Sequence, residues 1–382
     1  MESGEADLEG RRAPRTEVMS AHLVSSTMKA QLRPSAPTMG PVARPHQFDQ
    51  QALAAYLRDQ GRPLKGKLRV EQFTGGQSNP TYLVTSGAER YVLRRKPPGA
   101  LLPSAHAVDR EFRVMRALAG AGVPVPRVFA LCEDPAIIGT AFFLMEYVPG
   151  RVFWDATLPG VEPVERSALY DELNRVIAAL HGVDYRAVGL ADYGRPGNYL
   201  TRQIERWIRQ YRAAETERMD PMERLIDWLP VHIPDGDETT LVHGDYRIDN
   251  VIFHPSEPRI LAVLDWELST LGHPLADFAH HAMAWRVGPE EFRGIKGYDL
   301  AGLGIPDEAA YLAAYCRRTG RGTIANWDYY LAFNMFRMAA ILQGVLARAL
   351  QGNAASPEAL ATGKRARPMA EAGWRQVEHM QG

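Results

Sequence analysis

The spacing of apolar positions changes along the chain. In FDQQALAAYLRDQ, residues 48–60, apolar side chains recur at helical spacing, so ordered structure is expected to begin near Phe48. Three strand-like stretches follow, separated by a Gly-Gly and a Ser-Gly turn, at about 68–74, 80–86 and 90–96. SAHAVDREFRVMRALAGAG then predicts an amphipathic helix closed by glycines. PRVFALCED and GTAFFLMEYVPG predict two further strands.

After residue 150 the helical period dominates. The pattern predicts helices at about 166–181, 199–214, 219–228, 275–284, 306–318, 326–351 and 357–378. It also predicts two short strands, 251–254 and 260–264, joined by the turn HPSEPR. We therefore expect an α+β protein in which a small antiparallel sheet with one helix, residues 47–149, precedes a larger helical part, residues 150–382. A cleft between two such parts is a common site for a small ligand.

Composition narrows the choice of partners. The 382 residues are 46% hydrophobic and 23% charged, which is ordinary for a globular protein of two or three compact units. A net charge of −1 gives no electrostatic argument for nucleic acid or for an anionic membrane as a partner. No apolar run approaches the ~18 residues of a spanning helix. Cys132 and Cys316 are the only cysteines, so we expect no disulfide framework and a reducing, cytoplasmic location.

Residues 1–46 lack a hydrophobic period. Their first ten residues are acidic and small, and the remainder mixes basic residues with Ser, Pro and Met. We predict a disordered tail. Two alternatives are an organelle-targeting leader, against which the acidic start argues, and translation that begins at Met28 or Met39.

The stretch LVHGDYRIDNVIFHPSEPRILAVLDWELST, residues 241–270, concentrates the candidate chemistry. Asp245 follows a His-Gly pair, Asn250 follows after four intervening residues, and Asp265 ends the strand-like RILAVLD. Phosphoryl transfer from a magnesium nucleotide needs one carboxylate to orient the attacking hydroxyl, and a second carboxylate with an amide oxygen to hold Mg²⁺. Chance occurrence of H-G-D-x-x-x-x-N in such a chain has odds of about one in a thousand, from average residue usage. The spacing therefore favours a phosphotransferase.

HGDYRIDN and LDWE resemble the catalytic elements of the aminoglycoside phosphotransferase-type kinases, and the resemblance extends over about residues 47–380. The two elements correspond to H-R-D-x-x-x-x-N and D-F-G of protein kinases. Two segments look most like the subgroup related to the kinase domain of acyl-CoA dehydrogenase family members 10 and 11: YVLRRKPPGALLPSAHAVDREFRVMRAL and GRVFWDATLPG. This resemblance implies a bilobal, protein-kinase-like fold.

The same resemblance implies roles for single residues. Asp245 would be the catalytic base, and His243 would support its loop. Asn250 and Asp265 would be the Mg²⁺ ligands. Asp277, in HPLADFAHH, would brace the loop backbone from the start of a helix.

The small sheet would hold the nucleotide. TGGQSNPTY lies between the first two predicted strands, where backbone amides could approach phosphates, and we assign Gly75, Gly76 and Ser78 to this contact. An ordinary hairpin turn is the alternative. By resemblance, a hinge after the last strand would present backbone groups to a purine, in particular at Glu146 and Val148.

The cation that contacts the phosphates is expected in YVLRRKP. Strand alternation places Arg94 and Lys96 on the face of Val92 and turns Arg95 away. Arg94 stands where protein kinases have a lysine, so we prefer it and keep Lys96 as the alternative. By resemblance, Glu111 would be its partner on the following helix.

Other polar and aromatic residues favour structural interpretations. His280 and His281 lie in an apolar helix, where core or boundary histidines are more common than metal ligands. Asp249 is expected to be a surface or supporting residue, with substrate contact as the alternative. Core packing is the expectation for Trp154 and Trp266. The segment YYLAFNMFRMAAILQGVLARAL is interpreted first as a core helix and second as a wall of the acceptor site.

We therefore expect a small-molecule kinase that transfers the γ-phosphoryl of ATP, with GTP as the alternative, to a metabolite hydroxyl with the help of Mg²⁺. The resemblance suggests a hydroxyacyl thioester as acceptor. Aminoglycosides or other amino alcohols are the alternative, against which the lack of a dense acidic cluster argues. A protein kinase is disfavoured because Asp-Trp-Glu replaces Asp-Phe-Gly and no Ala-Pro-Glu follows.

A hypothesis of another class is a nucleotide-binding scaffold without catalysis. Such pseudokinases lack the base or a metal ligand, whereas all three positions are intact here. The expected partners are a nucleotide and a small hydroxylated substrate, and the expected assembly is a monomer or homodimer.

Overall fold

The computed structural model describes residues 38–62, 64–74, 79–99, 107–352 and 358–381. These residues belong to one compact unit that spans Pro34–Gly382. The predicted phosphate contacts Gly75, Gly76 and Ser78 lie outside the described residues, as do residues 1–37 of the predicted tail.

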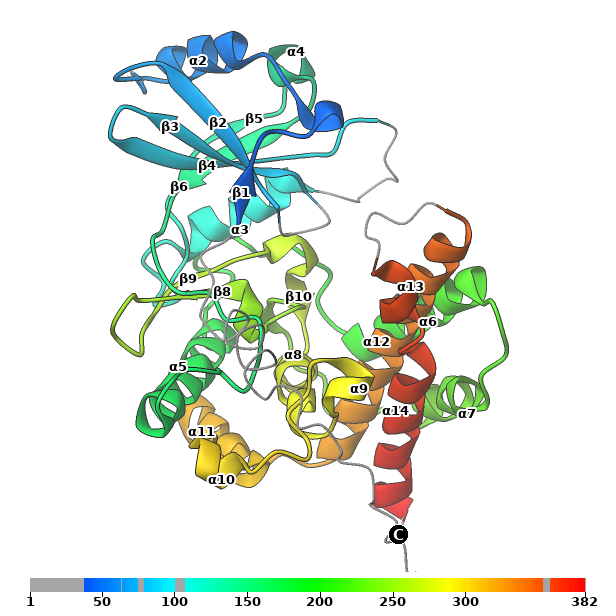
Figure 1. Ribbon diagram of the computed structural model, residues 1–382. Coiled ribbons are helices and arrows are strands. Elements are labelled where there is room, and N and C mark those ends of the chain that lie inside the picture. The colour runs from blue at the N-terminus through cyan, green and yellow to red at the C-terminus, as the bar shows by residue number, and fades with distance from the viewer. Residues whose placement is uncertain (1–37, 63, 75–78, 100–106, 353–357, 382) are drawn as a thin grey trace, which may run out of the picture. The chain divides into compact units, whose positions relative to one another are not determined.

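A six-stranded antiparallel sheet forms the N-terminal part of the described chain, with the strand order β1-β2-β3-β4-β6-β5 (Figure 1). Its strands are β1 (Met39–Gly40), β2 (Leu68–Phe73), β3 (Thr81–Ser86), β4 (Glu89–Arg95), β5 (Val128–Cys132) and β6 (Phe142–Glu146). The helices of this part are α2 (Gln50–Asp59), α3 (Val108–Leu118) and α4 (Pro135–Ile138). Apart from β1, the strands agree with the predicted stretches.

Alternation in β6 shows how the sheet is covered. Phe142 and Leu144 pack into a hydrophobic cluster with α2, whereas Phe143 and Met145 pack into the main core together with α3. Because successive side chains of a strand point to opposite faces, both faces of the sheet are buried. The face covered by α3 is the one that also meets the helical part.

Ordered structure begins earlier than the sequence predicted. Met39 and Gly40 pair with Phe73 and Gln72, so the predicted start near Phe48 is wrong for residues 38–46. A strand of two residues is too short to show a hydrophobic period, which explains the error.

The rest of the described chain is mainly helical. Its helices are α5 (Pro163–His181), α6 (Tyr199–Ala214), α7 (Asp220–Trp228), α8 (Pro274–Ala282), α9 (Pro289–Phe292), α10 (Leu300–Leu303), α11 (Glu308–Thr319), α12 (Trp327–Leu350), α13 (Ala359–Gly363) and α14 (Ala366–Gln381). Two strand pairs lie among them: β7 (Thr240–Val242) with β10 (Thr270–Gly272), and β8 (Val251–Phe253) with β9 (Ile260–Val263). The sequence predicted β8 and β9 but not the three-residue strands β7 and β10.

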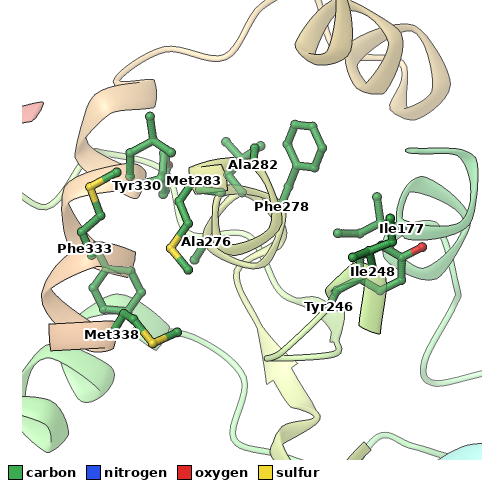
Figure 2. Close-up of a cluster of buried hydrophobic side chains, with 14 of the residues drawn as sticks. Ile177, Tyr246, Ile248, Ala276, Phe278, Ala282, Met283, Tyr330, Phe333 and Met338 are labelled. Atoms are coloured by element: carbon green, nitrogen blue, oxygen red, sulfur yellow. The ribbon is translucent and has the colours of Figure 1, made fainter. Parts of the chain in front are cut away.

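Helix α8 lies inside the hydrophobic core of this part. Figure 2 shows its side chains, among them Phe278, between Phe333 of α12 on one side and Ile177 of α5 on the other. Phe278 is fully buried and stacks on Tyr315 with ring centroids 3.9 Å apart. Helix α8 is therefore a rigid support for whatever side chains it presents.

Helix α12 is apolar enough and long enough, by composition alone, to cross a membrane, and no other described helix meets that test. However, 78% of its apolar window is buried inside the protein. Burial among α6, α8 and α14 accounts for its sequence, in agreement with the expected core helix.

We predict that two valines of α5 differ sharply in their contribution to stability. Val176 is fully buried and Val164 is 85% exposed. Val176→Ala should lower the free energy of unfolding by about 2–3 kcal/mol, because it removes two methyl groups and leaves a cavity. Val164→Ala, the matched control on the same helix, should change it by less than about 0.5 kcal/mol. Urea unfolding of both variants checks this, and equal losses would contradict the described core.

Candidate active site

The loop between β7 and β8, residues 243–250, carries the H-G-D motif. Helix α8 supports this loop. Asp277 accepts hydrogen bonds from the backbone N–H groups of His243 and Gly244, at 2.8 and 2.7 Å. Gly244 has φ +84°, and a Cβ there would lie 2.6 Å from the carbonyl oxygen of Leu268. Glycine is therefore required at this position of the motif. Asp277 braces the loop as the sequence predicted.

His243 links this loop to the end of β9. Its Nδ1 accepts from the backbone N–H of Asp245 at 3.2 Å, so its Nε2 carries the proton and donates to the carbonyl of Leu264 at 2.9 Å. The imidazole is fully buried and packs against Trp266. The ring of His243 therefore connects the segment of Asp245 with that of Asp265.

Three donors surround the carboxylate of Asp245, two from its own loop and one from α8. Nε2 of His280 lies 3.0 Å from Oδ1 and Nη1 of Arg247 lies 3.2 Å from it, while Nδ2 of Asn250 donates to Oδ2 at 3.0 Å. Burial by itself would raise the pKa of Asp245, but Arg247 and His280 hold it well below its ordinary value. Asp245 is therefore a carboxylate at neutral pH.

Asp265 sits in the left-handed region of backbone space, with φ 63°. A non-glycine residue is held there only at a cost, and such positions concentrate at functional sites. The backbone N–H of Leu264 donates to the carbonyl of Asn250 at 2.8 Å, which places the two predicted metal ligands on bonded segments.

Arg94 of β4 connects the sheet with these loops. Its Nε lies 2.9 Å from Oε2 of Glu111 on α3, and its Nη2 donates to Oδ1 of Asp265 at 2.6 Å. Glu267 lies 3.9 Å from the same Nη2. Burial and the neighbouring acids raise the pKa of Glu111, although Arg94 lowers it. The Arg94–Glu111 pair is the one that the resemblance implied.

The other two basic residues of YVLRRKP lie elsewhere. Arg95 is buried on the opposite face, over the ring of Phe48, and Lys96 lies 3.7 Å from Asp109. Of the three, Arg94 lines the large cavity described next.

A cavity of about 440 Å³ lies between the sheet and the helical part, within the usual size range of ligand sites. Its apolar wall consists mainly of Phe73, Val92, Met115, Phe143 and Met145. Its polar wall includes Arg94, Glu111, Asn250 and Asp265.

The predicted hinge borders the same cavity. Both Glu146 and Val148 line it. The N–H of Glu146 donates to the carbonyl of Arg127 at 2.8 Å, so it is unavailable to a ligand. No hydrogen bond within the described chain uses the backbone of Val148, which leaves that N–H and carbonyl available to a ligand.

A smaller cavity of about 50 Å³ adjoins the first, and Trp154 and Asp249 line both. Its wall is largely apolar and includes the aromatic rings of Tyr170, Trp285 and Phe292. Asp249 forms ion pairs with Arg247 at 3.0 Å and with Arg293 at 2.5 Å, and both arginines also line this cavity. The single acid of this wall is thus neutralised by two cations.

Two sequence expectations need correction. Trp154 is not a core residue, because it is 48% exposed and borders both cavities. His280 is buried as expected, yet it contacts Asp245, a contact that the core interpretation missed. Residues three apart on a helix share a face, so the assignment of Asp277 to the loop was a signal for His280. Trp266 and His281 are core residues as expected, the latter paired with the hydroxyl of Tyr311.

A buried carboxylate on a braced loop, an amide and a second carboxylate beside it, and a cation from the sheet define a kinase-like phosphotransferase site. Residues 69–330 match the model of the phosphotransferase enzyme family (APH), and the chain belongs to this family. The predicted family, fold class and enzyme class are thereby confirmed.

Curated relatives are longer than this chain. The chain is 50% identical over 342 residues to acyl-CoA dehydrogenase family member 10 of Mus musculus, a match that covers 88% of the chain and 32% of that protein. It is 43% identical over 335 residues to family member 11 of Homo sapiens, covering 86% of the chain and 43% of that protein. The chain therefore spans less than half the length of these relatives.

Solved structures agree with the fold. A Ralstonia eutropha JMP134 protein with the provisional name aminoglycoside phosphotransferase is 56% identical, with a TM-score of 0.80 and coverage of 87% of this chain and 99% of that one. A mutant of aminoglycoside phosphotransferase APH(4)-Ia, solved with ADP and hygromycin B, has a TM-score of 0.55 at 18% identity and covers 84% of this chain and 99% of its own. The second likeness supports the fold alone.

We predict that Asp277 stabilises the folded protein in a pH-dependent way. Burial would raise its pKa, but hydrogen bonds from His181 and from the His243 backbone lower it from 3.8 to about 2. A group whose pKa is lower in the folded state than in the unfolded state stabilises the fold at pH values above its unfolded pKa. This stabilisation is lost as the pH falls through the folded-state pKa. Asp277→Asn should therefore cost at least about 2 kcal/mol at neutral pH.

The difference in unfolding free energy between wild type and Asp277→Asn should shrink as the pH falls from about 4 to about 2. Denaturant unfolding across this range measures it. A difference that is constant with pH would show that the Asp277 charge contributes nothing.

Proposed function

We propose that this chain is a small-molecule kinase that transfers the γ-phosphoryl of Mg²⁺-bound ATP to a hydroxyl group. One observation carries the proposal: Arg94, Asn250 and Asp265 line one cavity of about 440 Å³, and Asn250 is hydrogen-bonded to Asp245. Phosphoryl transfer depends mainly on positioning and charge neutralisation, and these groups are of the types required.

The purine would occupy the apolar part of this cavity. Val92, Met115 and Phe143 would contact its ring, and the backbone of Val148 would bond its edge. Arg94 would then lie toward the phosphates. The predicted glycine-loop contact stays a prediction.

The side chains beside the loop fit a magnesium ion. The amide nitrogen of Asn250 donates to both the backbone and the carboxylate of Asp245, which directs its oxygen away as an acceptor. Three carboxylates, those of Glu111, Asp265 and Glu267, surround the single guanidinium of Arg94. The carboxylate oxygens of Asp265 and the amide oxygen of Asn250 are ligands of the kind that a hard divalent cation prefers. When bound, Mg²⁺ would neutralise phosphate charge between the nucleotide and these ligands.

Asp245 would align the acceptor hydroxyl with the γ-phosphorus and take its proton late. Its lowered pKa makes it a weak base. That suits a loose transition state, in which orienting the nucleophile matters more than deprotonating it early.

For the acceptor we propose a hydroxylated acyl compound such as a hydroxyacyl-CoA. The smaller cavity beside the loop is largely apolar, and its one acid, Asp249, is paired with two arginines. Such a wall fits apolar chains and anionic groups better than a polycationic aminoglycoside, so the alternative acceptor is not favoured. The similarity to portions of acyl-CoA dehydrogenase family members 10 and 11 also supports this class. Cytoplasmic location and a monomeric or homodimeric state stay predictions.

We predict that two substitutions separate chemistry from metal binding. Asp245→Asn should lower the turnover of Mg²⁺-ATP by at least about 100-fold while leaving nucleotide binding intact, because the base contributes to the transition state. Asp265→Ala should instead weaken Mg²⁺-dependent binding of ATP.

Steady-state turnover and Mg²⁺-dependent thermal stabilisation by ATP measure these two effects. A screen of hydroxylated acyl-CoAs, sugars and amino alcohols for a mass gain of one phosphate would identify the acceptor. Wild-type turnover equal to that of Asp245→Asn would refute the proposal and favour a binding scaffold.

A further inference from the structure

His280 is a buried polar residue that the phosphoryl-transfer scheme above does not use. It lies on α8, one turn after Asp277, and its side chain is 1% exposed. Its Nε2 lies 3.0 Å from Oδ1 of Asp245. Its Nδ1 is buried and has no hydrogen-bond partner within the described chain. A buried polar atom without a partner costs stability, so a purely structural role leaves His280 poorly explained.

The hydrogen bond has a defined direction. A carboxylate can only accept, so the proton of a neutral imidazole must be on Nε2. Burial lowers the pKa of His280, and Arg337 and Arg247 lower it further, whereas Asp245 raises it. The neutral ring thus donates from Nε2 to Asp245, and its Nδ1 carries no proton.

The geometry points to a function for this donor. The terminal torsion of an aspartate is broad, so a carboxylate is not oriented by its own rotamer. Asn250 holds Oδ2 of Asp245, while His280 and Arg247 hold Oδ1. Arg247 also pairs with Asp249 at 3.0 Å and is shared between the two acids. His280 is the donor that comes from the rigid core helix.

We propose that His280 is a positioning residue that orients the carboxylate of Asp245 toward the acceptor hydroxyl. The proposal rests on the proposed kinase function. Helix α8 then aligns the site twice: Asp277 holds the backbone of the loop, and His280 holds the carboxylate of the base. Both side chains lie on one face of the helix, which the packing of Phe278 keeps in place.

A matched pair of substitutions tests the proposal. The amide of glutamine reaches roughly as far as Nε2 of histidine, whereas that of asparagine ends near Nδ1. His280→Gln should therefore keep Mg²⁺-ATP turnover within about 3-fold of wild type, and His280→Asn should lower kcat by about 10- to 100-fold, as expected when a reacting group is misplaced. The KM for ATP should stay within about 2-fold in both variants, because the nucleotide cavity is not touched.

A double variant excludes a general structural defect. If His280 acts through Asp245, then Asp245→Asn combined with His280→Asn should be no slower than Asp245→Asn alone. Histidine ¹⁵N NMR of the full chain adds a readout that is independent of turnover: the His280 ring should be protonated at Nε2, and its shift should change in Asp245→Asn.

The outcomes are distinct. Turnover of His280→Asn equal to wild type would overturn the role of His280 and leave the kinase proposal intact. A further tenfold loss in the double variant, or a His280 ring protonated at Nδ1, would also overturn it. Wild-type turnover no greater than that of Asp245→Asn would overturn the kinase proposal and this inference together.

Discussion

The ion pairs of Arg94 are the interaction on which the site depends. One guanidinium from β4 joins Glu111 of α3 to Asp265, which follows β9. The side chains of Arg94 and Glu111 are only 13% and 1% exposed, so this pair is screened little by solvent, whereas Asp265 is 34% exposed. Removing one member of such a buried group leaves an uncompensated charge, which costs more than the group itself contributes to stability. The sheet, α3 and the loop of Asp265 are therefore held in one arrangement around the large cavity.

The second constraint comes from α8. Its apolar side chains are fully buried between α12 and α5 (Figure 2), so its position is determined by the core. From this position Asp277 supports the H-G-D loop and His280 reaches Asp245. The loop also packs its own Tyr246 and Ile248 into the same core. The buried helix α8 thus helps to fix the positions of the loop residues. Functional residues are commonly found on loops that a rigid scaffold positions.

Much of this organisation follows from the sequence. The alternation of side chains along a strand predicted that Arg94 faces the cavity and Arg95 the opposite side of the sheet. The H-G-D-x-x-x-x-N spacing identified Asp245 and Asn250. Features that depend on distant contacts were missed. The strands β1, β7 and β10 have two or three residues and show no period. The contact of His280 depends on the path of α8 relative to the loop, and its three-residue spacing from Asp277 was the one local signal for it. The N–H of Glu146 donates to Arg127, next to the pairing of β5 with β6. This contact also depends on tertiary structure, so the sequence did not reveal it.

We propose that the cavity between the sheet and the helical part binds Mg²⁺ and ATP, with Arg94, Asn250 and Asp265 at the phosphate end. A crystal structure with Mg²⁺ and a non-hydrolysable ATP analogue tests it most directly. We expect the purine against Val148, the γ-phosphate on the side of Asp245, and the metal within about 2.0–2.1 Å of oxygens from Asn250 and Asp265. A nucleotide bound elsewhere, or a metal that contacts neither side chain, would contradict the account.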